Sequence, residues 1–245
     1  MPILEGQGVT KYFGGLAAVS NVDFHVDQGE IVGLIGPNGA GKTTLFNLIS
    51  AALPVSSGEI RFKGQKLNGL KPHQICQMGV SRTFQETKVF GNMPVFQNAL
   101  VGAFFGTPTH ISGTDAAREA GQALEFVGLS AMSATPIQDL TLVNQKRVEV
   151  ARALATKPEL LLLDELMAGL NPAEVSEAME LVTRIRDKGI TIFMVEHVMK
   201  AIMGICGRVM AFHHGEKIAE GTPREIAANK KVIEIYLGEE TRAGS

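Results

Sequence analysis

The sequence contains a phosphate-binding pattern in eight consecutive residues, Gly36-Pro37-Asn38-Gly39-Ala40-Gly41-Lys42-Thr43. This run fits Gly-x-x-x-x-Gly-Lys-Ser/Thr and lies between an apolar segment and a segment of helical composition, the context in which the motif binds phosphate. Glycines let successive backbone N–H groups converge on one anion, and the N-terminus of the following helix adds partial positive charge. We therefore predict that Lys42 contacts the β- and γ-phosphates of a nucleoside triphosphate, and that the Thr43 hydroxyl coordinates Mg²⁺.

Two adjacent carboxylates, Asp164 and Glu165, follow the apolar run Leu160 to Leu163. Ligands of α/β proteins bind at the carboxyl ends of the strands, so both side chains are expected at the nucleotide. We predict that Asp164 holds Mg²⁺ through water and that Glu165 polarises the attacking water as general base. An Asp-Glu pair after a strand is otherwise only a solvated turn, and it is the phosphate loop that favours the functional interpretation.

The elements that must position these residues alternate along the chain. Apolar or alternating runs predict strands over residues 30–35, 58–62, 78–84, 159–164, 190–195, 208–212 and 216–220. Helical patterns cover residues 42–50, 115–127, 172–188, 198–205, 223–228 and 231–237. Alternation of strands and helices predicts an α/β fold with a mostly parallel sheet covered on both faces. We expect one domain over residues 1–245, with a core of 1–87 and 156–245 and a helical insert at 88–155.

Composition excludes several classes of protein. The 245 residues include 23 Lys and Arg against 25 Asp and Glu, a formal net charge of −2, so a nucleic-acid partner is not expected. Residues 1–5 resemble no signal peptide, and Cys76 and Cys206 fit neither a disulfide nor a metal pattern, so a reduced, cytosolic compartment is expected. The paired His213-His214 is interpreted as a strand end.

The chain is nevertheless apolar, with 45% hydrophobic residues and a mean hydropathy of +0.12. No window offers the roughly 20 apolar residues of a membrane-spanning helix. The nearest candidate, Val89 to Thr114, carries no Asp, Glu, Lys or Arg but is broken by Pro94 and Pro108.

The order of these motifs resembles the ATPase subunit of an ABC transporter: residues Gly36 to Thr44, Gln85, a helical insert, Asp164-Glu165 and His197. Within that family, Ser81 to Gln85, Ala151 to Thr156 and the C-terminal Glu220 to Pro223, Val232 to Glu234 and Tyr236 to Gly238 resemble the LivG-type ATPases of branched-chain amino acid uptake. The resemblance implies a P-loop NTPase core with an antiparallel β subdomain and a helical subdomain insert.

Further roles are implied by the resemblance alone. Phe13 matches the aromatic residue that stacks on adenine, Gln85 the glutamine that contacts Mg²⁺ and the attacking water, and His197 the switch histidine near the γ-phosphate. Without the resemblance, a lone Phe is more often a core residue and a lone His more often structural. ATP and Mg²⁺ are the expected cofactors.

The family signature Leu-Ser-Gly-Gly-Gln aligns with Leu140-Thr141-Leu142-Val143-Asn144, a clear departure. Thr141 keeps a hydroxyl for the nucleotide of the partner subunit, but Val143 replaces a glycine whose bare backbone approaches phosphate. Either the branch tolerates the change, or a heterodimer with a second ATPase has one competent site at this chain's phosphate loop and one impaired site at the partner's. In a homodimer both sites would inherit Val143. Leu166 also replaces a usual proline, and residues 168–171 lack the usual aspartate.

The function that the resemblance implies is MgATP hydrolysis energising uptake of branched-chain or related amino acids. The expected partners are integral membrane permease subunits, a second ATPase subunit or a second copy, and indirectly a periplasmic or extracellular substrate-binding protein. The chain would lie peripherally at the cytoplasmic face of the inner membrane and be soluble when isolated. Lipopolysaccharide export, urea or amide uptake, iron–sulfur cluster assembly by a soluble ABC ATPase and a non-hydrolysing nucleotide switch remain alternatives. We expect Phe90, Met93 and Phe96 to face the permease in part; a role in the core of the insert is the other interpretation.

Overall fold

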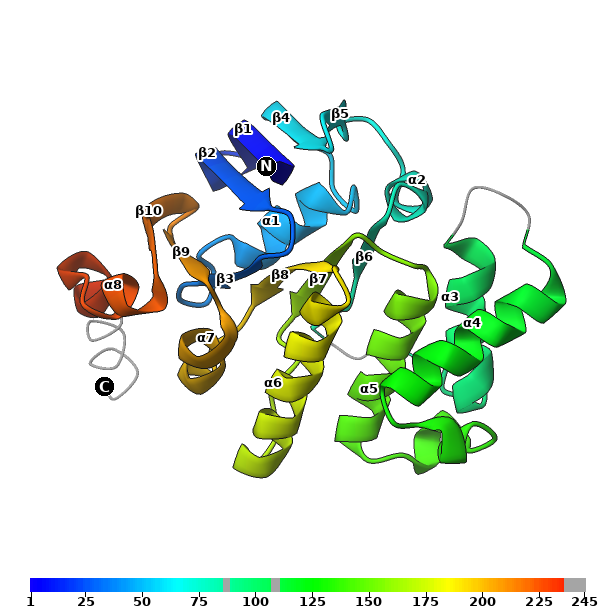
Figure 1. Cartoon of the computed structure of the whole chain (residues 1–245). Helices are drawn as coiled ribbons and strands as arrows, with labels where there is room; N and C mark the ends of the chain where they lie inside the picture. Colours follow the sequence, from blue (N-terminus) through cyan, green and yellow to red (C-terminus); the bar gives the residue numbers. More distant parts are fainter. Residues whose placement is uncertain (86–88, 107–110, 236–245) are drawn as a thin grey trace.

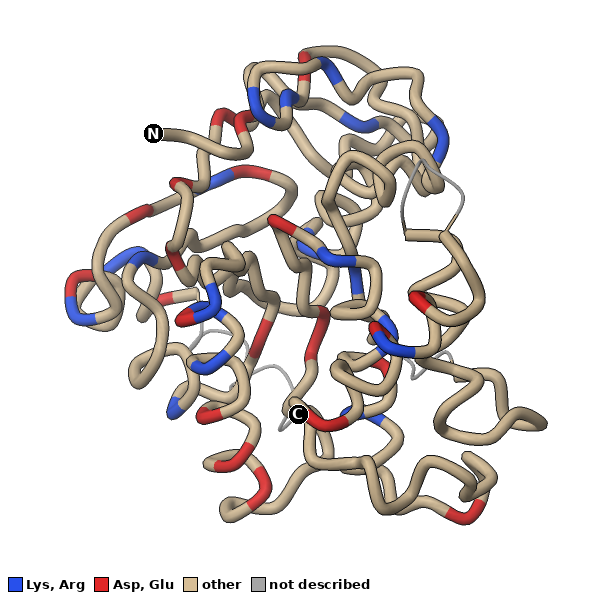
Figure 2. Tube along the Cα trace, turned by 45° about the vertical axis from the view of Figure 1, so that its right-hand side comes forward, with Lys and Arg blue, Asp and Glu red and all other residues tan. Residues whose placement is uncertain are grey.

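The computed structural model describes residues 1–85, 89–106 and 111–235. Two β-sheets and the helices around them make up the fold (Figure 1). No helix of these residues is long and apolar enough to cross a membrane. Lys and Arg are interspersed with Asp and Glu along the trace, apart from uncharged stretches such as residues 43–58 and 89–106 (Figure 2).

The larger sheet has the strand order β10-β9-β3-β8-β7-β6. Its strands are β3 (Ile31–Ile35), β6 (Val80–Arg82), β7 (Leu160–Asp164), β8 (Thr191–Val195), β9 (Arg208–His213) and β10 (Glu216–Gly221). All pairs are parallel except β9 with β10, which confirms the predicted mostly parallel sheet. The strand predicted over residues 78–84 is shorter, because Met78 caps a helix and Gly79 has a φ of 103°.

Apolar residues cover both faces of this sheet, which explains much of the chain's high hydropathy. All residues of β3, β7 and β8 are buried. Alternate residues of β7 enter two separate cores: Leu161 and Leu163 pack on the side of the helical insert, Leu160 and Leu162 on the side of the second sheet. Parallel strands covered on both faces require this composition.

The smaller sheet is antiparallel, with the order β2-β1-β4-β5. Its strands are β1 (Pro2–Phe13), β2 (Leu16–Asp27), β4 (Ser57–Phe62) and β5 (Gln65–Lys66). Strands β1 and β2 were not individually predicted, although the two-residue turn Gly14-Gly15 between them is a hairpin signal. Gly6, Gly8 and several register shifts interrupt the alternation by which such strands are recognised.

The helices are α1 (Lys42–Ile49), α2 (Pro72–Gln77), α3 (Val95–Phe105), α4 (Gly113–Phe126), α5 (Leu142–Ala155), α6 (Pro172–Asp187), α7 (Met199–Ile205) and α8 (Pro223–Ala227). Helix α6 begins where predicted, because Asn171 accepts hydrogen bonds from the N–H groups of Ala173 and Glu174. Residues 230–235 are also helical; the rest of the helix predicted over 231–237 lies outside the described residues.

Helices α3, α4 and α5 lie between β6 and β7 in the chain and pack against one another at one side of the molecule (Figure 1). Helix α1 lies between the two sheets, and its apolar residues Leu45 and Phe46 belong to the core that both sheets share. The ends of β3, β6, β7 and β8 therefore meet at one edge, where the predicted site residues stand.

Candidate nucleotide site

The loop between β3 and α1 can be built only with glycine at two of its positions. Gly36 and Gly41 have φ values of 151° and 102°, and a Cβ on either would lie 2.3 Å from a backbone oxygen, that of Phe212 or Ala18. As the residue before α1, Gly41 has no side chain to cap the helix. The N-terminus of α1 is thus uncapped and suited to an anion.

Lys42 is hydrogen-bonded to this loop. Its buried Nζ donates hydrogen bonds to the carbonyl oxygens of Gly36, at 2.6 Å, and Pro37, at 2.8 Å. A phosphate oxygen that entered the loop would compete with these carbonyls for the ammonium. Lys42 can therefore transfer from the loop to an anion with a small movement of its end.

Asp164 ends β7 as a buried carboxylate with one oxygen held and one oxygen unpaired. Oδ2 lies 2.7 Å from Nη2 of Arg82, and the Asp164 N–H donates to Oγ1 of Thr83 at 3.2 Å. Oδ1 is buried and has no hydrogen-bond partner among the residues described. Burial raises the pKa of Asp164, and the Arg82 guanidinium opposes that rise. An unpaired carboxylate oxygen and the hydroxyl of Thr43, in the first turn of α1, are oxygen donors of the kind that suits Mg²⁺.

Gln85, Glu165 and His197 come together at a single carboxylate oxygen. Oε2 of Glu165 accepts a hydrogen bond from Nε2 of Gln85 at 3.0 Å and lies 3.0 Å from Nε2 of His197. The three residues follow β6, β7 and β8, which are neighbours in the parallel sheet. The structure thus brings Glu165, predicted from the carboxylate pair, together with Gln85 and His197, the two residues that the resemblance added.

The backbone of Glu165 is itself tied down. Its φ is +52°, a conformation that non-glycine residues rarely adopt and that costs of order 1–3 kcal/mol. Its N–H donates to the carbonyl oxygen of Val195 at 2.9 Å, and its own carbonyl accepts from Nζ of Lys146 at 3.0 Å. Both polar groups of this strained peptide are therefore satisfied by other elements.

Two buried charges without a predicted role adjoin this site: Lys146 is bonded to the Glu165 carbonyl, and Glu196 precedes His197. Glu196 accepts a hydrogen bond on Oε1 from the Met167 N–H at 2.8 Å, and its Oε2 has no partner among the residues described. Burial raises the pKa of Glu196 and lowers that of Lys146, while their mutual attraction opposes both changes. The sequence does offer one signal for Glu196: it stands directly after the apolar strand that ends at Val195 and directly before His197.

Phe13 is not a core residue, so the core interpretation is wrong for it. The side chain is 48% exposed at the end of β1, where it pairs with Leu16 of β2. The adjoining Ala18 packs against Gly41 of the phosphate loop. The hairpin thus presents an exposed aromatic ring close to the loop. His213 ends β9 as expected, and His214 follows in the turn.

The divergent signature keeps a regular helix start. Thr141 precedes α5 with a φ of −63°, and its side chain makes no capping hydrogen bond. Val143 lies within the first turn of α5, so glycine is not needed there for backbone conformation. The side chain of Val143 is half-buried and lines a small cavity with Leu166 and Leu170, so the substitution adds bulk to the first turn of α5.

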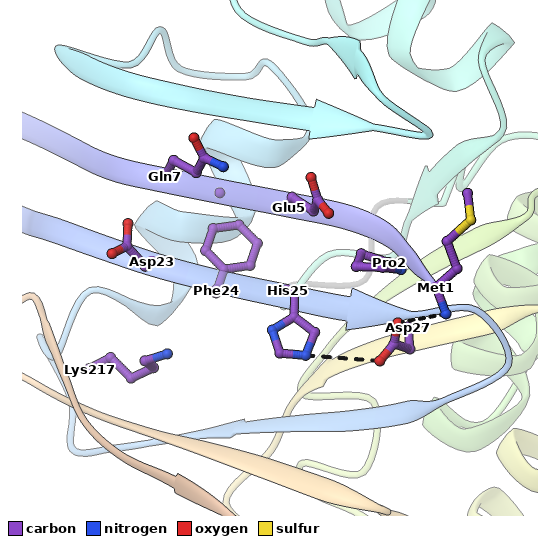
Figure 3. A pocket seen from close by; sticks show the side chains of 10 residues that line it. Met1, Pro2, Glu5, Gln7, Asp23, Phe24, His25, Asp27 and Lys217 are labelled. Atoms are coloured by element: carbon purple, nitrogen blue, oxygen red, sulfur yellow. Dashed lines mark ion pairs between the residues drawn. The ribbon is translucent and has the colours of Figure 1, made fainter.

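A hollow of about 450 Å³ elsewhere contains none of these residues (Figure 3). It lies over β1 and β2, with side chains that include Glu5, Asp23 and Lys217. Asp27 lies 3.0 Å from the terminal amine of Met1 and 3.9 Å from Nε2 of His25. No residue of the phosphate loop lines this open hollow. No group of three metal-ligating side chains occurs in the described part of the chain.

A parallel sheet whose edge combines a phosphate loop, a buried aspartate and a clustered Glu–Gln–His set defines an ATP-binding cassette. The chain belongs to the ABC transporter family as such a cassette, an ATPase: the family model described as ABC transporter matches residues 19–168, more than half of its length. A second model, described as a branched-chain amino acid ATP-binding cassette transporter, matches residues 216–241.

Curated relatives match the whole chain. It is 42% identical to the high-affinity branched-chain amino acid transport ATP-binding protein LivG of Escherichia coli, over 97% of this chain and 98% of that protein. Identity to the corresponding protein BraF of Pseudomonas aeruginosa is 38%, with the same coverage. The lipopolysaccharide export ATP-binding protein LptB of Haemophilus influenzae is more distant, at 32% over 98% of this chain and 99% of that protein.

Solved structures agree with the fold. A crystal structure of an ATP-binding cassette of an ABC transporter in its ADP conformation matches with a TM-score of 0.90 and 30% identity. The match covers 97% of this chain and 99% of the other. The predicted fold class and family are confirmed.

Proposed function

We propose that this chain hydrolyses MgATP at the cytoplasmic face of the cell membrane to drive import of branched-chain or related amino acids. The observation that carries the substrate class is similarity to LivG over 97% of the chain, together with the branched-chain model matched at residues 216–241. Identity to the lipopolysaccharide export protein is 10 percentage points lower (42 against 32) over the same span, which favours import.

In this proposal Glu165 is the general base, and Gln85 and His197 orient the attacking water through the oxygen at which they meet. Lys42 leaves the loop carbonyls for the β- and γ-phosphates, and Phe13 stacks on the adenine. The backbone N–H groups of residues 36–44 bind the phosphate oxygens, except at Pro37, which has no N–H. Thr43, Asp164 and Gln85 would hold Mg²⁺, which neutralises charge on the phosphates when bound. The core is assigned to residues 1–87 and 156–245, and the helical subdomain to 88–155.

The test is uptake of labelled leucine into vesicles that contain the complete transporter. Glu165→Gln should abolish ATP hydrolysis and uptake while ATP binding persists. Glu180→Gln, an exposed change on α6, should alter neither. ATP-dependent uptake of urea without leucine, or association with a soluble scaffold instead of a permease, would contradict the assigned class.

The permease surface is proposed to be a groove of about 280 Å³ between β6 and α2 on one side and α3 and α5 on the other. Phe105, 71% exposed, lines it, and Phe104 beside it is also exposed. Phe90 and Met93 are exposed as expected, but Phe96 is partly buried against the core and is a weaker candidate. Residues 107–110 of the uncharged stretch lie outside the described residues.

Phe105→Asp should release the permease in co-purification, because a carboxylate in an apolar interface loses its hydration. Met203→Asp is the matched control: its side chain is also exposed, on α7 away from the groove. Equal retention of the permease by both variants would contradict this surface.

We further propose a heterodimer with one competent and one impaired site, because Val143 is bulky where the partner's phosphate would lie. Val143→Gly should raise ATP turnover at the site completed by this chain's signature. If Val143→Gly leaves turnover unchanged, the branch tolerates valine and the asymmetry is rejected.

A further inference from the structure

Arg82 is a buried cation that none of the roles above uses. Its side chain is 6% exposed and that of its ion-pair partner Asp164 is 0% exposed. Nη1 donates to Oδ1 of Asn47, on the phosphate-loop helix α1, at 2.7 Å and to Oγ of Ser50, the residue that caps this helix, at 3.2 Å. Nη2 donates to Oδ2 of Asp164 at 2.7 Å. One guanidinium thus bridges the loop helix and the carboxylate at the end of β7.

Aromatic rings fix the plane of this guanidinium. Its Cζ lies 5.7 Å from the ring centre of Phe46, on α1, and 5.3 Å from that of Phe84, which follows β6. Arginine suits such a position because its planar fork donates in two directions and stacks on rings, which an ammonium does not do. The orientation of Nη2 toward Asp164 is therefore set by three elements.

Stability alone does not account for this arrangement. Removing two charges from water costs about as much as their attraction returns, so a buried ion pair contributes little net stability compared with apolar residues. The pair does determine which oxygen of Asp164 is engaged. Oδ2 is taken by Arg82, and Oδ1 remains buried and without a hydrogen-bond partner among the described residues.

We propose that Arg82 is a positioning residue that holds Asp164 by Oδ2 and so presents Oδ1 to Mg²⁺ or to a water molecule bound to it. This inference rests on the proposed magnesium role of Asp164. Residues that orient a metal ligand from behind commonly change metal affinity by about tenfold to a hundredfold when they are replaced. Arg82 should therefore affect Mg²⁺ dependence and not nucleotide binding as such.

The experiment measures binding of a fluorescent ATP analogue to the full chain, first in EDTA and then along a Mg²⁺ titration. Arg82→Gln should leave affinity in EDTA within about twofold and raise the half-saturating Mg²⁺ concentration by about tenfold or more. Arg82→Lys should recover part of the loss, because it keeps the charge without the fork. Asn47→Ala keeps Arg82 and removes one of its acceptors, so it should raise the half-saturating Mg²⁺ concentration by a smaller factor. This variant replaces Arg82→Gln in the test if Arg82→Gln does not fold.

Arg208→Gln is the matched control, since Arg208 is a mostly buried arginine that pairs with Glu30 and Glu220 away from the site. It should leave both affinities unchanged. The Arg82 variants could have the same half-saturating Mg²⁺ concentration as wild type while Asp164→Asn has a raised one. That result would overturn the role of Arg82 alone. Unaltered Mg²⁺ dependence in Asp164→Asn would instead overturn the proposed magnesium role, and this inference with it.

Discussion

Replacing Lys146 by methionine tests whether the conformation of Glu165 depends on a residue of the signature helix. Lys146 lies in the second turn of α5, and its buried ammonium donates to the Glu165 carbonyl at 3.0 Å. Methionine keeps the apolar stem and removes the donor. Glu165 then retains its φ of +52° without one of the three hydrogen bonds of its backbone; the bonds from its N–H to Val195 and from the Ala168 N–H to its carbonyl, at 3.2 Å, remain.

The expected size of the effect follows from that one hydrogen bond. A hydrogen bond to a charged group contributes about 1.5–3 kcal/mol, comparable with the roughly 1–3 kcal/mol of strain in a left-handed non-glycine residue. About 1.4 kcal/mol corresponds to a tenfold change in rate. We therefore expect kcat to fall by about tenfold to a hundredfold. The KM for ATP should change little, because the ammonium of Lys146 is hydrogen-bonded to Glu165 and not to the phosphate loop.

The assay is phosphate release from MgATP by the assembled transporter, with KM and kcat measured separately. Lys146→Arg should restore part of kcat, since it keeps a charged donor. Arg147→Met, which removes the neighbouring cation and its surface pair with Glu177, should leave kcat unchanged. A wild-type kcat in Lys146→Met, or a raised KM at constant kcat, would show that Glu165 holds its conformation without Lys146.

Three further changes test separate parts of the structure. Phe13→Ala should weaken ATP binding by about threefold to tenfold through loss of stacking, whereas Tyr12→Ala beside it should not, as measured by nucleotide titration. Gly36→Ala should lower the melting temperature and abolish ATP binding, because its Cβ would meet a carbonyl oxygen at 2.3 Å. Gly29→Ala, also at positive φ but with open space around it, should lower the melting temperature less. Burial raises the pKa of Glu196 above 4.5, its value in the unfolded chain. The native state therefore holds a proton that the unfolded chain has already lost, and the free energy of unfolding falls as pH rises above about 4.5. Glu196→Gln lacks this titration, and its melting temperature relative to wild type should increase from pH 5 to pH 8; a constant difference would contradict the shift.

The large sheet was predictable because its strands carry a strong local signal. Runs such as Leu160 to Leu163 are apolar without interruption and are bounded by helices with clear start residues, as Asn171 shows for α6. The N-terminal hairpin carries a weaker signal. Gly6 stands in β1 because the ring of Phe24 packs over it, a long-range reason that alternation along one strand cannot reveal.

The motif residues of the site were predictable because each lies at or shortly after the carboxyl end of a parallel strand, in a motif of recognisable composition. The charges that support them were not. Arg82 pairs with a residue 82 positions away, and Lys146 binds the backbone of Glu165 rather than a side chain. A charged group that is buried must form hydrogen bonds within the protein, because leaving it unpaired there costs several kcal/mol. Which partner it finds depends on how the chain packs. Only the packed structure shows which one it is.

Helix α5 connects two sites that the sequence treats as separate. Its first residues present the signature to the proposed partner subunit, and Lys146, five residues after Thr141, holds Glu165 of this chain's own site. At about 1.5 Å per residue these positions are separated by roughly 7.5 Å along one rigid helix. A displacement of α5 when the partner's nucleotide binds would therefore change the distance from Lys146 to the Glu165 carbonyl. Because Glu165 is strained and its Oε2 is shared with Gln85 and His197, we expect this proposed general base to respond to the position of the signature helix as well as to its own nucleotide.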